Sequence, residues 1–273
     1  NAKLMIMDEP TSSLSEKEAE DLFRIIAQVK ARGVTVLFIS HRLDEVKRIC
    51  DRVTVMRDGR TVSCVSMAET SVDEIVRLMV GREIQNKYPK VKARHGEPVL
   101  SVKNLSRKGI LHDVSFTLYA GEVLGFAGLV GAGRTETMRA VTGADAIDSG
   151  TIEVFGKEVL IRNPRDSIDA GIAFLTEDRK GQGLILIQTV AFNTTLVKLD
   201  QFAQHGVLKL KAIRSATERI TKELRLRAPS VDVPVGKLSG GNQQKVVIAK
   251  WLLSQSKIFI FDEPTRGIDV GAK

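Results

Sequence analysis

The chain carries one motif twice: Ile6-Met7-Asp8-Glu9-Pro10-Thr11 near its start and Ile260-Phe261-Asp262-Glu263-Pro264-Thr265 near its end. The two copies lie 254 residues apart, which is a domain-sized period. Each acidic pair follows an apolar run, residues 4–7 or 258–261, that is too short for a helix and typical of a strand buried on both faces. The sequence therefore predicts that a buried strand ends in an Asp-Glu pair at two places.

Strands and helices alternate around both copies, which predicts an α/β fold with a parallel, doubly wound sheet. Ser15 has the character of a helix cap, and the helical period after it ends at Gly33. Further strands are expected at residues 34–39, 52–56, 60–65, 99–105, 111–119, 122–127 and 172–175, with a hairpin at 151–160. Further helices are expected at residues 43–50, 72–80, around 138–141, at 190–226, and from 242 to 253.

Composition limits the classes of function. The 273 residues, 43% of them hydrophobic, can build one large core or two smaller ones. A net charge of +8 suits nucleotide, nucleic acid or an acidic lipid face, but 5% aromatic residues give little material for base stacking. Cys50 and Cys64 form no CxxC pair, so neither a disulfide framework nor a zinc site is expected. The expected compartment is a reducing cytosol. No membrane-spanning or targeting segment is predicted.

A glycine-rich turn follows the strand expected at residues 122–127. Its glycines would let backbone N–H groups curl around an anion below a helix N-terminus. A phosphate loop usually continues with Lys and a hydroxyl residue, whereas this chain has Arg134, Thr135 and then Glu136. Arg is bulkier and forked, and Glu136 adds negative charge. From this loop alone, phosphate binding and a plain strand-to-helix turn are equally favoured. The loop consists of Gly128, Gly131, Ala132 and Gly133.

The acidic pairs predict metal and water chemistry. The first carboxylate, Asp8 or Asp262, can hold magnesium through water, and the second, Glu9 or Glu263, can orient or deprotonate an attacking water. Solvated acids at a sheet edge are the alternative, which the repetition of the motif makes less favoured. His41 ends the next expected strand and is a candidate to polarise a terminal phosphate. A lone histidine is also often structural.

A second anion site is predicted at Leu238-Ser239-Gly240-Gly241, followed by Asn242-Gln243-Gln244 and an apolar-periodic helix. The hydroxyl of Ser239 and two glycine N–H groups would stand at the helix N-terminus. The alternative is an ordinary serine cap after a glycine turn. Taken alone, this segment favours the alternative.

Together the motifs resemble the ATP-binding cassette (ABC) family, most closely the double-cassette ATPase subunits of bacterial simple-sugar importers. The resemblance is carried by residues 75–83, 131–136, 176–180, 238–245 and 262–269. It implies a P-loop NTPase-type α/β fold: a parallel sheet core with antiparallel β and helical subdomains, in parts of two tandem nucleotide-binding domains. Residues 1–84 would be the latter part of a first cassette, 85–98 a linker, and 99–273 the front of a second. The chain is thus expected to be a fragment of one roughly twice as long.

The resemblance also implies roles for individual residues, because each ATP in this family lies between the phosphate loop of one cassette and the signature of the other. Glu9, Asp8 and His41 would then share a site with the Ser239 segment. Catalytic roles fall on Glu9, His41 and Glu263, and magnesium binding on Asp8, Asp262 and Thr135. Nucleotide contacts fall on Gly128, Gly131, Ala132, Gly133, Arg134, Thr135, Glu136, Glu177, Leu238, Ser239, Gly240, Gly241 and Gln243.

The chain departs from the family pattern at Arg134, at Glu136, and at Glu177, where the Gln loop normally offers an amide. Ser15 also replaces the usual Asp in the first Asp loop, residues 12–15. We therefore expect hydrolysis mainly at the site of Glu9, and nucleotide binding with little turnover at the site of Glu263.

The function implied is ATP hydrolysis, with ATP and Mg²⁺ as cofactors, coupled to monosaccharide uptake at the cytoplasmic face of the membrane. Transmembrane permease subunits would be direct partners, a periplasmic or extracellular sugar-binding protein an indirect one, and no nucleic acid is expected. Residues 184–197 are the candidate docking segment, with plain helical core as the alternative. Alternative functions are a nucleoside importer ATPase, a soluble tandem ATPase acting on ribosomes or nucleic acid, and a nucleotide-gated module without catalysis. Residues 1–273 alone are expected to be inactive.

Overall fold

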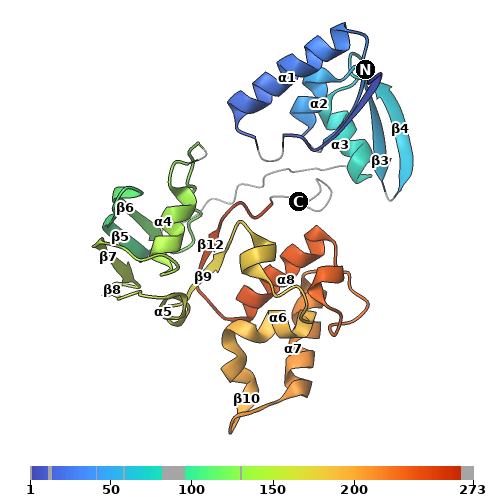
Figure 1. The fold of residues 1–273 in the computed structure, drawn as a ribbon. Helices are drawn as coiled ribbons and strands as arrows, with labels where there is room; N and C mark the ends of the chain where they lie inside the picture. Colours follow the sequence, from blue (N-terminus) through green and yellow to red (C-terminus); the bar gives the residue numbers. More distant parts are fainter. Residues whose placement is uncertain are drawn as a thin grey trace. The chain divides into compact units, whose positions relative to one another are not determined.

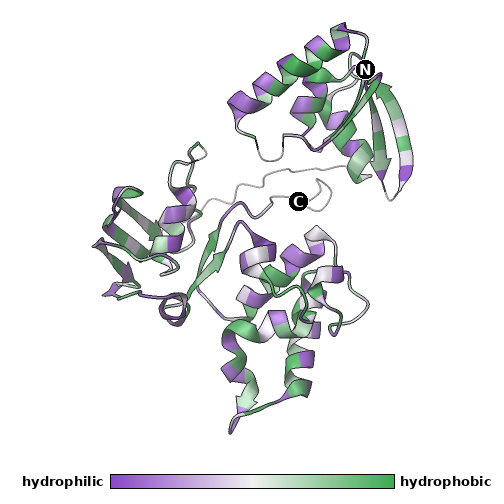
Figure 2. Ribbon diagram, viewed as in Figure 1, coloured by the Kyte–Doolittle hydropathy of each residue, from purple (hydrophilic) through white to green (hydrophobic). Residues whose placement is uncertain are grey.

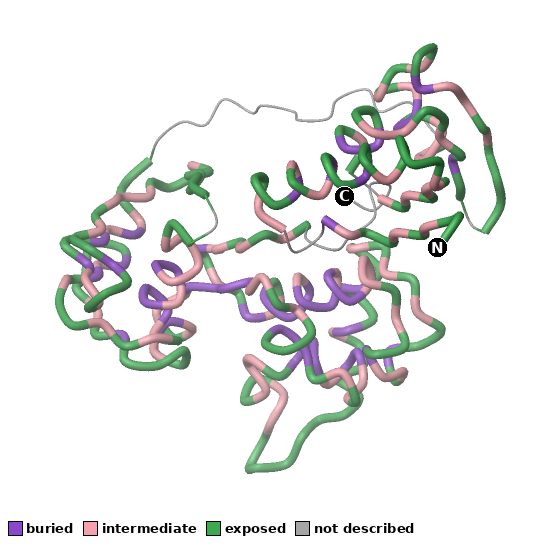
Figure 3. Tube along the Cα trace, turned by 45° about the horizontal axis from the view of Figure 1, so that its top comes forward, coloured by how far each residue is buried: buried purple, intermediate pink, exposed green. Residues whose placement is uncertain are grey.

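The computed structural model describes residues 2–11, 14–40, 42–57, 59–81, 96–129 and 131–265. The chain falls into two compact units, and each is described by itself. Unit 1 comprises residues 1–90 and 269–273, and unit 2 comprises residues 91–268 (Figure 1). Each unit has its own buried interior, with exposed residues along its loops and edges (Figure 3).

Unit 1 begins with a parallel strand pair that carries the first acidic motif. Strand β1 (Leu4–Asp8) pairs with β2 (Thr35–Ile39), and helix α1 (Glu16–Ala31) connects them. As predicted, Ser15 caps α1: its hydroxyl accepts from the backbone N–H of Glu18, whose side chain accepts in return from the N–H of Ser15. The helix buries three side chains against the strands: Ala19, Phe23 and Ile26.

The prediction that β1 is buried on both faces is wrong. Leu4 and Ile6 are 55% and 62% exposed, and Leu37 and Ile39 of β2 are exposed on the same face. Helix α1 packs only on the opposite face, where Met7 joins its cluster. Because successive strand residues point to opposite faces, one covering helix buries only every second residue.

The rest of unit 1 follows the predicted order. Val46, Val55, Met67 and Ile75 form its second cluster. The elements are helix α2 (Leu43–Ile49), the antiparallel strands β3 (Arg52–Arg57) and β4 (Arg60–Ser66), and helix α3 (Val72–Val80). Gly81 ends α3 in the left-handed region at φ 74°, which favours glycine.

Unit 2 opens with an antiparallel sheet in the order β6-β5-β7-β8. Its strands are β5 (Pro98–Arg107), β6 (Leu111–Tyr119), β7 (Ser149–Val154) and β8 (Lys157–Glu158), the last two forming the predicted hairpin. Helix α4 (Arg134–Val141) adds Val141 to the cluster formed by Leu100, Val102 and Ile152. This sheet and α4 make one core with Ile258.

A parallel pair, β9 (Ile172–Leu175) and β12 (Ile258–Phe261), links this core to a helical part, and both strands are strongly apolar (Figure 2). The first strand is buried at all four positions. Helices α5 (Pro164–Asp169) and α8 (Gly240–Leu253) pack on β9, and helices α6 (Val190–Thr195) and α7 (Leu210–Glu223) pack on α8 and on each other. Short turns complete the unit: the π-helical η1 (Arg179–Gly183) and the 3-10 turns η2 (Leu196–Phe202) and η3 (Val235–Lys237).

Three sequence predictions fail in unit 2. Strand β12 is not buried on both faces, because Phe261 is 52% exposed. Residues 122–127 form no strand: Val123 is 97% exposed, and none of the described strands pairs with this segment to satisfy its backbone groups. The helix predicted over residues 190–226 is interrupted by the hairpin β10 (Ala203–Gln204) and β11 (Val207–Leu208). His205 and Gly206 both have positive φ, 49° and 79°, as a tight two-residue hairpin turn requires.

Within the described ranges, no helix combines the length and apolar character needed to cross a bilayer.

Candidate functional site

The glycine loop of unit 2 leads into the N-terminus of α4. Gly131 and Gly133 have φ of 83° and 84°, a region that favours glycine, and Gly133 is the N-cap of the helix. A Cβ added to Gly128 would stand 2.8 Å from the Cβ of Ala132, so the loop is tightly closed on itself. The first turn of a helix leaves N–H groups without helical partners, and such groups bind anions.

Two side chains at the start of α4 reach the second acidic pair. The hydroxyl of Thr135 donates to Oδ2 of Asp262 at 2.7 Å. Nη1 of Arg134 lies 3.3 Å from Oε1 of Glu263. The backbone N–H of Asp262 donates to the carbonyl of Leu175, which fixes the end of β12 beside β9. The structure thus brings together the glycine loop and the acidic pair that the sequence separates by more than a hundred residues.

The Arg134–Glu263 pair has a chemical consequence. Both side chains are partly exposed, 34% and 48%, so the pair adds little stability. The guanidinium meets one oxygen, Oε1, of the carboxylate that the sequence assigned to an attacking water. The same contact fixes the position of the Arg134 guanidinium, which replaces the lysine found at this position in most phosphate loops.

Both acidic turns have the same unusual backbone. Glu9 and Glu263 each have a φ of 44°. A non-glycine residue in this region costs on the order of 1–3 kcal/mol and persists where surrounding contacts hold it. Such strain clusters at functional sites, and its recurrence in both motif copies supports a functional role for both glutamates.

In unit 1, Asp8 ends β1 and Glu9 begins the turn. The backbone N–H of Glu9 donates to the carbonyl of Ile39 at 2.8 Å, which continues the β1–β2 ladder by one bond. The glutamate therefore lies at the carboxyl edge of a parallel pair, where α/β folds place their ligands. The predicted catalytic His41 lies outside the described residues.

The signature segment starts α8. Ser239 is the N-cap, and its hydroxyl accepts from Nδ2 of Asn242 at 3.0 Å. Gly240 begins the helix, followed by Gly241, so the first turn presents backbone N–H groups without bulky side chains. Gln243 is 5% exposed and donates to the carbonyl of Leu238 at 3.1 Å. Its role as a nucleotide contact stays a prediction, as does a site shared by Ser239 and Glu9.

The Gln-loop position follows β9. Glu177 lies between β9 and η1. Asp178 caps η1 by accepting from the N–H groups of Lys180 and Gly181. Nζ of Lys250, on α8, donates to the carbonyl of Gly183 at 2.7 Å. Burial lowers the pKa of Lys250 to about 8. Sequence reasoning missed this link between the Gln-loop turn and the signature helix, since nothing in the helical period marks Lys250 as buried.

The donor set beside the glycine loop fits magnesium. Thr135 and Asp262 place a hydroxyl and a carboxylate oxygen next to each other, which are oxygen ligands of the kind that Mg²⁺ prefers. Within the ranges given above, no group of three or more His, Cys, Asp or Glu residues is arranged to hold a metal. Mg²⁺ usually takes one or two protein ligands together with water and phosphate oxygens, so a smaller donor set suffices.

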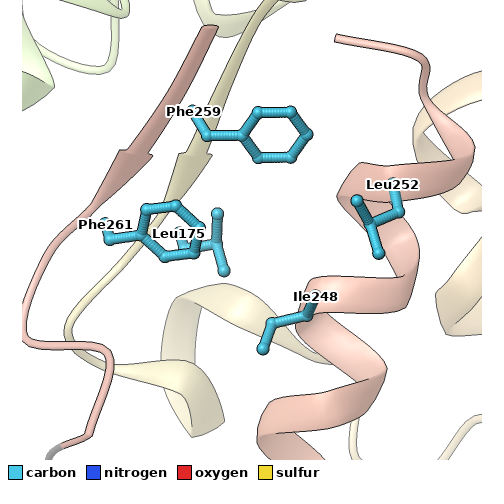
Figure 4. Close-up of a pocket in the computed structure, with 5 residues that line it drawn as sticks. All are labelled: Leu175, Ile248, Leu252, Phe259 and Phe261. Carbon is cyan, nitrogen blue, oxygen red and sulfur yellow. The ribbon is translucent and has the colours of Figure 1, made fainter. Parts of the chain in front are cut away.

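A neighbouring cavity of about 290 Å³ does not suit a phosphate. It is lined by Leu175, Ile248, Leu252, Phe259 and Phe261, all apolar, between the strand pair and α8 (Figure 4). The rings of Phe259 and Phe261 are stacked with centroids 6.2 Å apart. The polar chemistry of unit 2 therefore lies at the glycine loop and the acidic pair rather than in this cavity.

A family model described as ABC transporter matches residues 111–266. The chain belongs to this family. Over its whole length it is 55% identical to "Ribose import ATP-binding protein RbsA 3" of Rubrobacter xylanophilus. It is 51% identical to "Putative ribose/galactose/methyl galactoside import ATP-binding protein 1" of Agrobacterium fabrum. The match covers 55% and 54% of these proteins, so the chain spans about half the length of the curated relatives it matches.

Solved structures show the fold of one cassette. The ATP-binding cassette MJ1267 of an ABC transporter superposes with a TM-score of 0.53 at 22% identity, covering 64% of this chain and 72% of that one. The post-hydrolysis dimer of the ATP-binding cassette MJ0796 with ADP and Pi gives 0.53 at 21% identity, covering 63% and 77%. The family and the α/β cassette fold predicted from the motifs are confirmed, and the tandem arrangement stays a prediction.

Proposed function

We propose that this chain is part of the ATP-binding, ATP-hydrolysing subunit of a sugar importer. Residues 1–84 would belong to a first cassette, 85–98 to a linker and 99–273 to a second. Two observations support the proposal: the acidic motif recurs with the same backbone, and the relatives matched along the whole chain are named for ribose or galactose import. The longer chain containing residues 1–273 is called the double-cassette protein below.

The observation that carries the mechanism is the Arg134–Glu263 contact. A general base must reach a water, and Glu263 instead faces a guanidinium on its own unit. The repeat of the motif supplies a second glutamate for this role, Glu9. Glu9 would therefore orient and deprotonate the attacking water, while unit 2 would bind nucleotide with little turnover.

The other site residues would bind and orient. Mg²⁺, when bound with ATP, neutralises charge that develops on the transferred phosphoryl group. Thr135 and Asp262 would hold it at the second site, and Asp8 would do so at the first. The first turn of α4 and the Ser239-Gly240-Gly241 turn of α8 would direct N–H groups at phosphate oxygens. His41 would polarise the terminal phosphate.

An importer ATPase implies permease partners, and unit 2 offers a place for one. A cavity of about 400 Å³ lies in its helical part, and Gln188, Thr189, Ala191, Phe192 and Thr195 of the predicted docking segment line part of it. Leu208 and Leu210 line it from the β10–β11 hairpin and α7, and Leu210 is 71% exposed. Docking there would place the subunit at the cytoplasmic face of the membrane.

Steady-state ATP hydrolysis by the double-cassette protein tests the assignment of the two acids. Glu9→Gln is expected to lower kcat about 100-fold or more, because the amide cannot accept the water's proton. Glu263→Gln is expected to lower kcat less than about threefold, because that group is engaged by Arg134. Unchanged kcat in Glu9→Gln together with loss in Glu263→Gln would reverse the assignment.

The sugar substrate and the inactivity of residues 1–273 alone are tested separately. With the permease in liposomes, hydrolysis should rise when the binding protein carries ribose or galactose and should not rise with a nucleoside. Stimulation by nucleosides only would favour the nucleoside importer, and salt-dependent nucleic-acid binding would favour the soluble tandem ATPase. Vigorous Mg²⁺-dependent hydrolysis by residues 1–273 alone would contradict the division into incomplete cassettes.

A further inference from the structure

We propose that Glu45 is a positioning residue that fixes the turn carrying Glu9 against the end of β2. The inference rests on the proposed function, in which Glu9 orients the attacking water. It concerns a buried carboxylate in unit 1 that neither the motifs nor the mechanism above uses.

Glu45 joins two segments that lie far apart in the sequence. It belongs to α2 and is 6% exposed. Its Oε2 accepts from the hydroxyl of Thr11 at 2.7 Å and from that of Ser40 at 3.3 Å. Thr11 follows Glu9 by two residues, and Ser40 directly follows β2. One carboxylate oxygen therefore ties the acidic turn to the end of the neighbouring strand.

The charge of Glu45 makes this link stronger than a neutral one. Nη1 of Arg42 lies 2.6 Å from Oε1 of Glu45, so the buried carboxylate has a cationic partner. Burying a carboxylate without such partners is strongly unfavourable. Val46 of the same helix already supplies the apolar contact to the core, so packing does not require a side chain from position 45. Hydrogen bonds from hydroxyls to an ionised acceptor are about twice as strong as neutral ones. A carboxylate at position 45 can therefore bind the hydroxyls of Thr11 and Ser40 more strongly than a neutral side chain could.

The turn needs holding because its backbone is strained. The φ of Glu9 is 44°, a conformation that persists only when contacts on both sides determine it. On one side, the N–H of Glu9 donates to the carbonyl of Ile39. On the other, Thr11, itself 2% exposed, is anchored by Glu45. Since a displacement of about 1 Å at a reacting group can cost about 100-fold in rate, the anchor bears on catalysis.

The test compares isosteric variants of the double-cassette protein by kcat, by KM for ATP and by melting temperature. Thr11→Val keeps the shape of the side chain and removes the donor, and it is expected to lower kcat about 10- to 100-fold with KM within about twofold. Thr11→Ser keeps the hydroxyl and should retain kcat within about threefold. Thr217→Val is the matched control, because Thr217 is equally buried and bonds only within its own helix, to the carbonyl of Ile213.

A double-mutant cycle then assigns the effect to Glu45. Glu45→Gln keeps an acceptor but loses the charge, so kcat should fall about fivefold, with no further loss when Thr11→Val is already present. The inference would be overturned if the losses of kcat in Glu45→Gln and Thr11→Val multiplied in the double variant. It would also be overturned if kcat in Thr11→Val stayed within twofold of the parent. An equal loss of kcat in Thr217→Val would likewise overturn it. A Glu9→Gln protein with full turnover would overturn the proposed function as well, which separates the two failures.

Discussion

The two acidic turns share a backbone and differ in their contacts. Glu9 and Glu263 have the same φ, and each follows a strand paired in parallel. In unit 1 the turn is anchored to α2, through the hydrogen bond from Thr11 to the carboxylate of Glu45. In unit 2 the acids are met from the start of α4, Asp262 by Thr135 and Glu263 by Arg134. The repeated motif has the same backbone at both places, and the side chains that contact the two turns differ.

The two units also bury charges of opposite sign, each of which ties a loop to a helix. Glu45 in unit 1 is 6% exposed and accepts from hydroxyls. Lys250 in unit 2 is 9% exposed, donates to the carbonyl of Gly183 and lies 5.3 Å from the ring centre of Trp251. Substitutions at Lys250, Thr135, Arg134 and Ser15 test these differences between the two units.

The largest effect concerns the pH dependence of unfolding in unit 2. Burial lowers the pKa of Lys250 to about 8, whereas the pKa in the unfolded chain is about 10.4. Between these values the unfolded state binds more protons, so Lys250 contributes stability that is full above about pH 10.4 and is lost as pH falls through about 8. The free energy of unfolding relative to Lys250→Met should change by on the order of 3 kcal/mol over this window. The free energies of unfolding are measured with urea for the parent and for Lys250→Met. The same pH dependence in both proteins would contradict the lowered pKa of Lys250.

The next effect removes the hydroxyl shared by the glycine loop and the acidic pair. Thr135→Val should weaken Mg²⁺-dependent ATP binding at the second site by about 100-fold, because it removes the proposed magnesium ligand and the partner of Asp262. Thr135→Ser should bind as the parent does. Calorimetric titration of the double-cassette protein with ATP, with and without Mg²⁺, measures the difference. Equal weakening without Mg²⁺ would show that Thr135 does not act through the ion.

A third variant makes the two sites more alike. Arg134→Lys places the usual phosphate-loop residue opposite Glu263 and removes the contact of Nη1 with Oε1, so ATP should bind the second site about tenfold more tightly. Hydrolysis there should stay low while Glu177 occupies the Gln-loop position. Arg134→Gln is the control, since it releases Glu263 without supplying a cation. Affinities in both variants no higher than in the parent would mean that the ion pair does not limit binding, and equal gains in both would mean that the lysine cation adds nothing.

The smallest effect tests the start of α1 in unit 1. Ser15→Ala removes the capping box and should destabilise unit 1 by about 1 kcal/mol. Ser15→Asp keeps a capping oxygen and should be close to neutral. Hydrogen exchange resolved by segment measures unit 1 against unit 2, whose own capping box at Asn163 is untouched. Equal loss of protection in both units would contradict a local role for Ser15.

Much of the fold could be predicted because local signals were strong. The capping residue Ser15 placed α1, the Gly81 boundary placed the end of α3, and the repeated motif placed β1 and β12. The failures have physical reasons. Residues 122–127 have the composition of a strand, but a strand forms only beside a partner, and periodicity carries no information about partners. The β10–β11 hairpin depends on left-handed φ at His205, which its sequence does not signal.

The candidate site was predictable by residue type and not by contact. Arg134, Glu136 and Glu177 stood out as departures from a pattern, yet only the structure shows that Arg134 meets Glu263. Glu45 gave no signal, because on a short charged helix it resembles an ordinary exposed residue. Lys250 was hidden in the same way. Buried charges become visible only when the elements around them are assembled.

The most direct test of the inequivalence of the two glutamates is to count nucleotides after a single turnover. The double-cassette protein is loaded with Mg²⁺ and ATP, freed of excess nucleotide, quenched in acid after one cycle, and its ATP and ADP are quantified. We expect about one ADP and one intact ATP for each protein, because in the proposed assignment Glu9 activates a water and Glu263, in contact with Arg134, does not. Two ADP for each protein, with no ATP retained, would contradict the account.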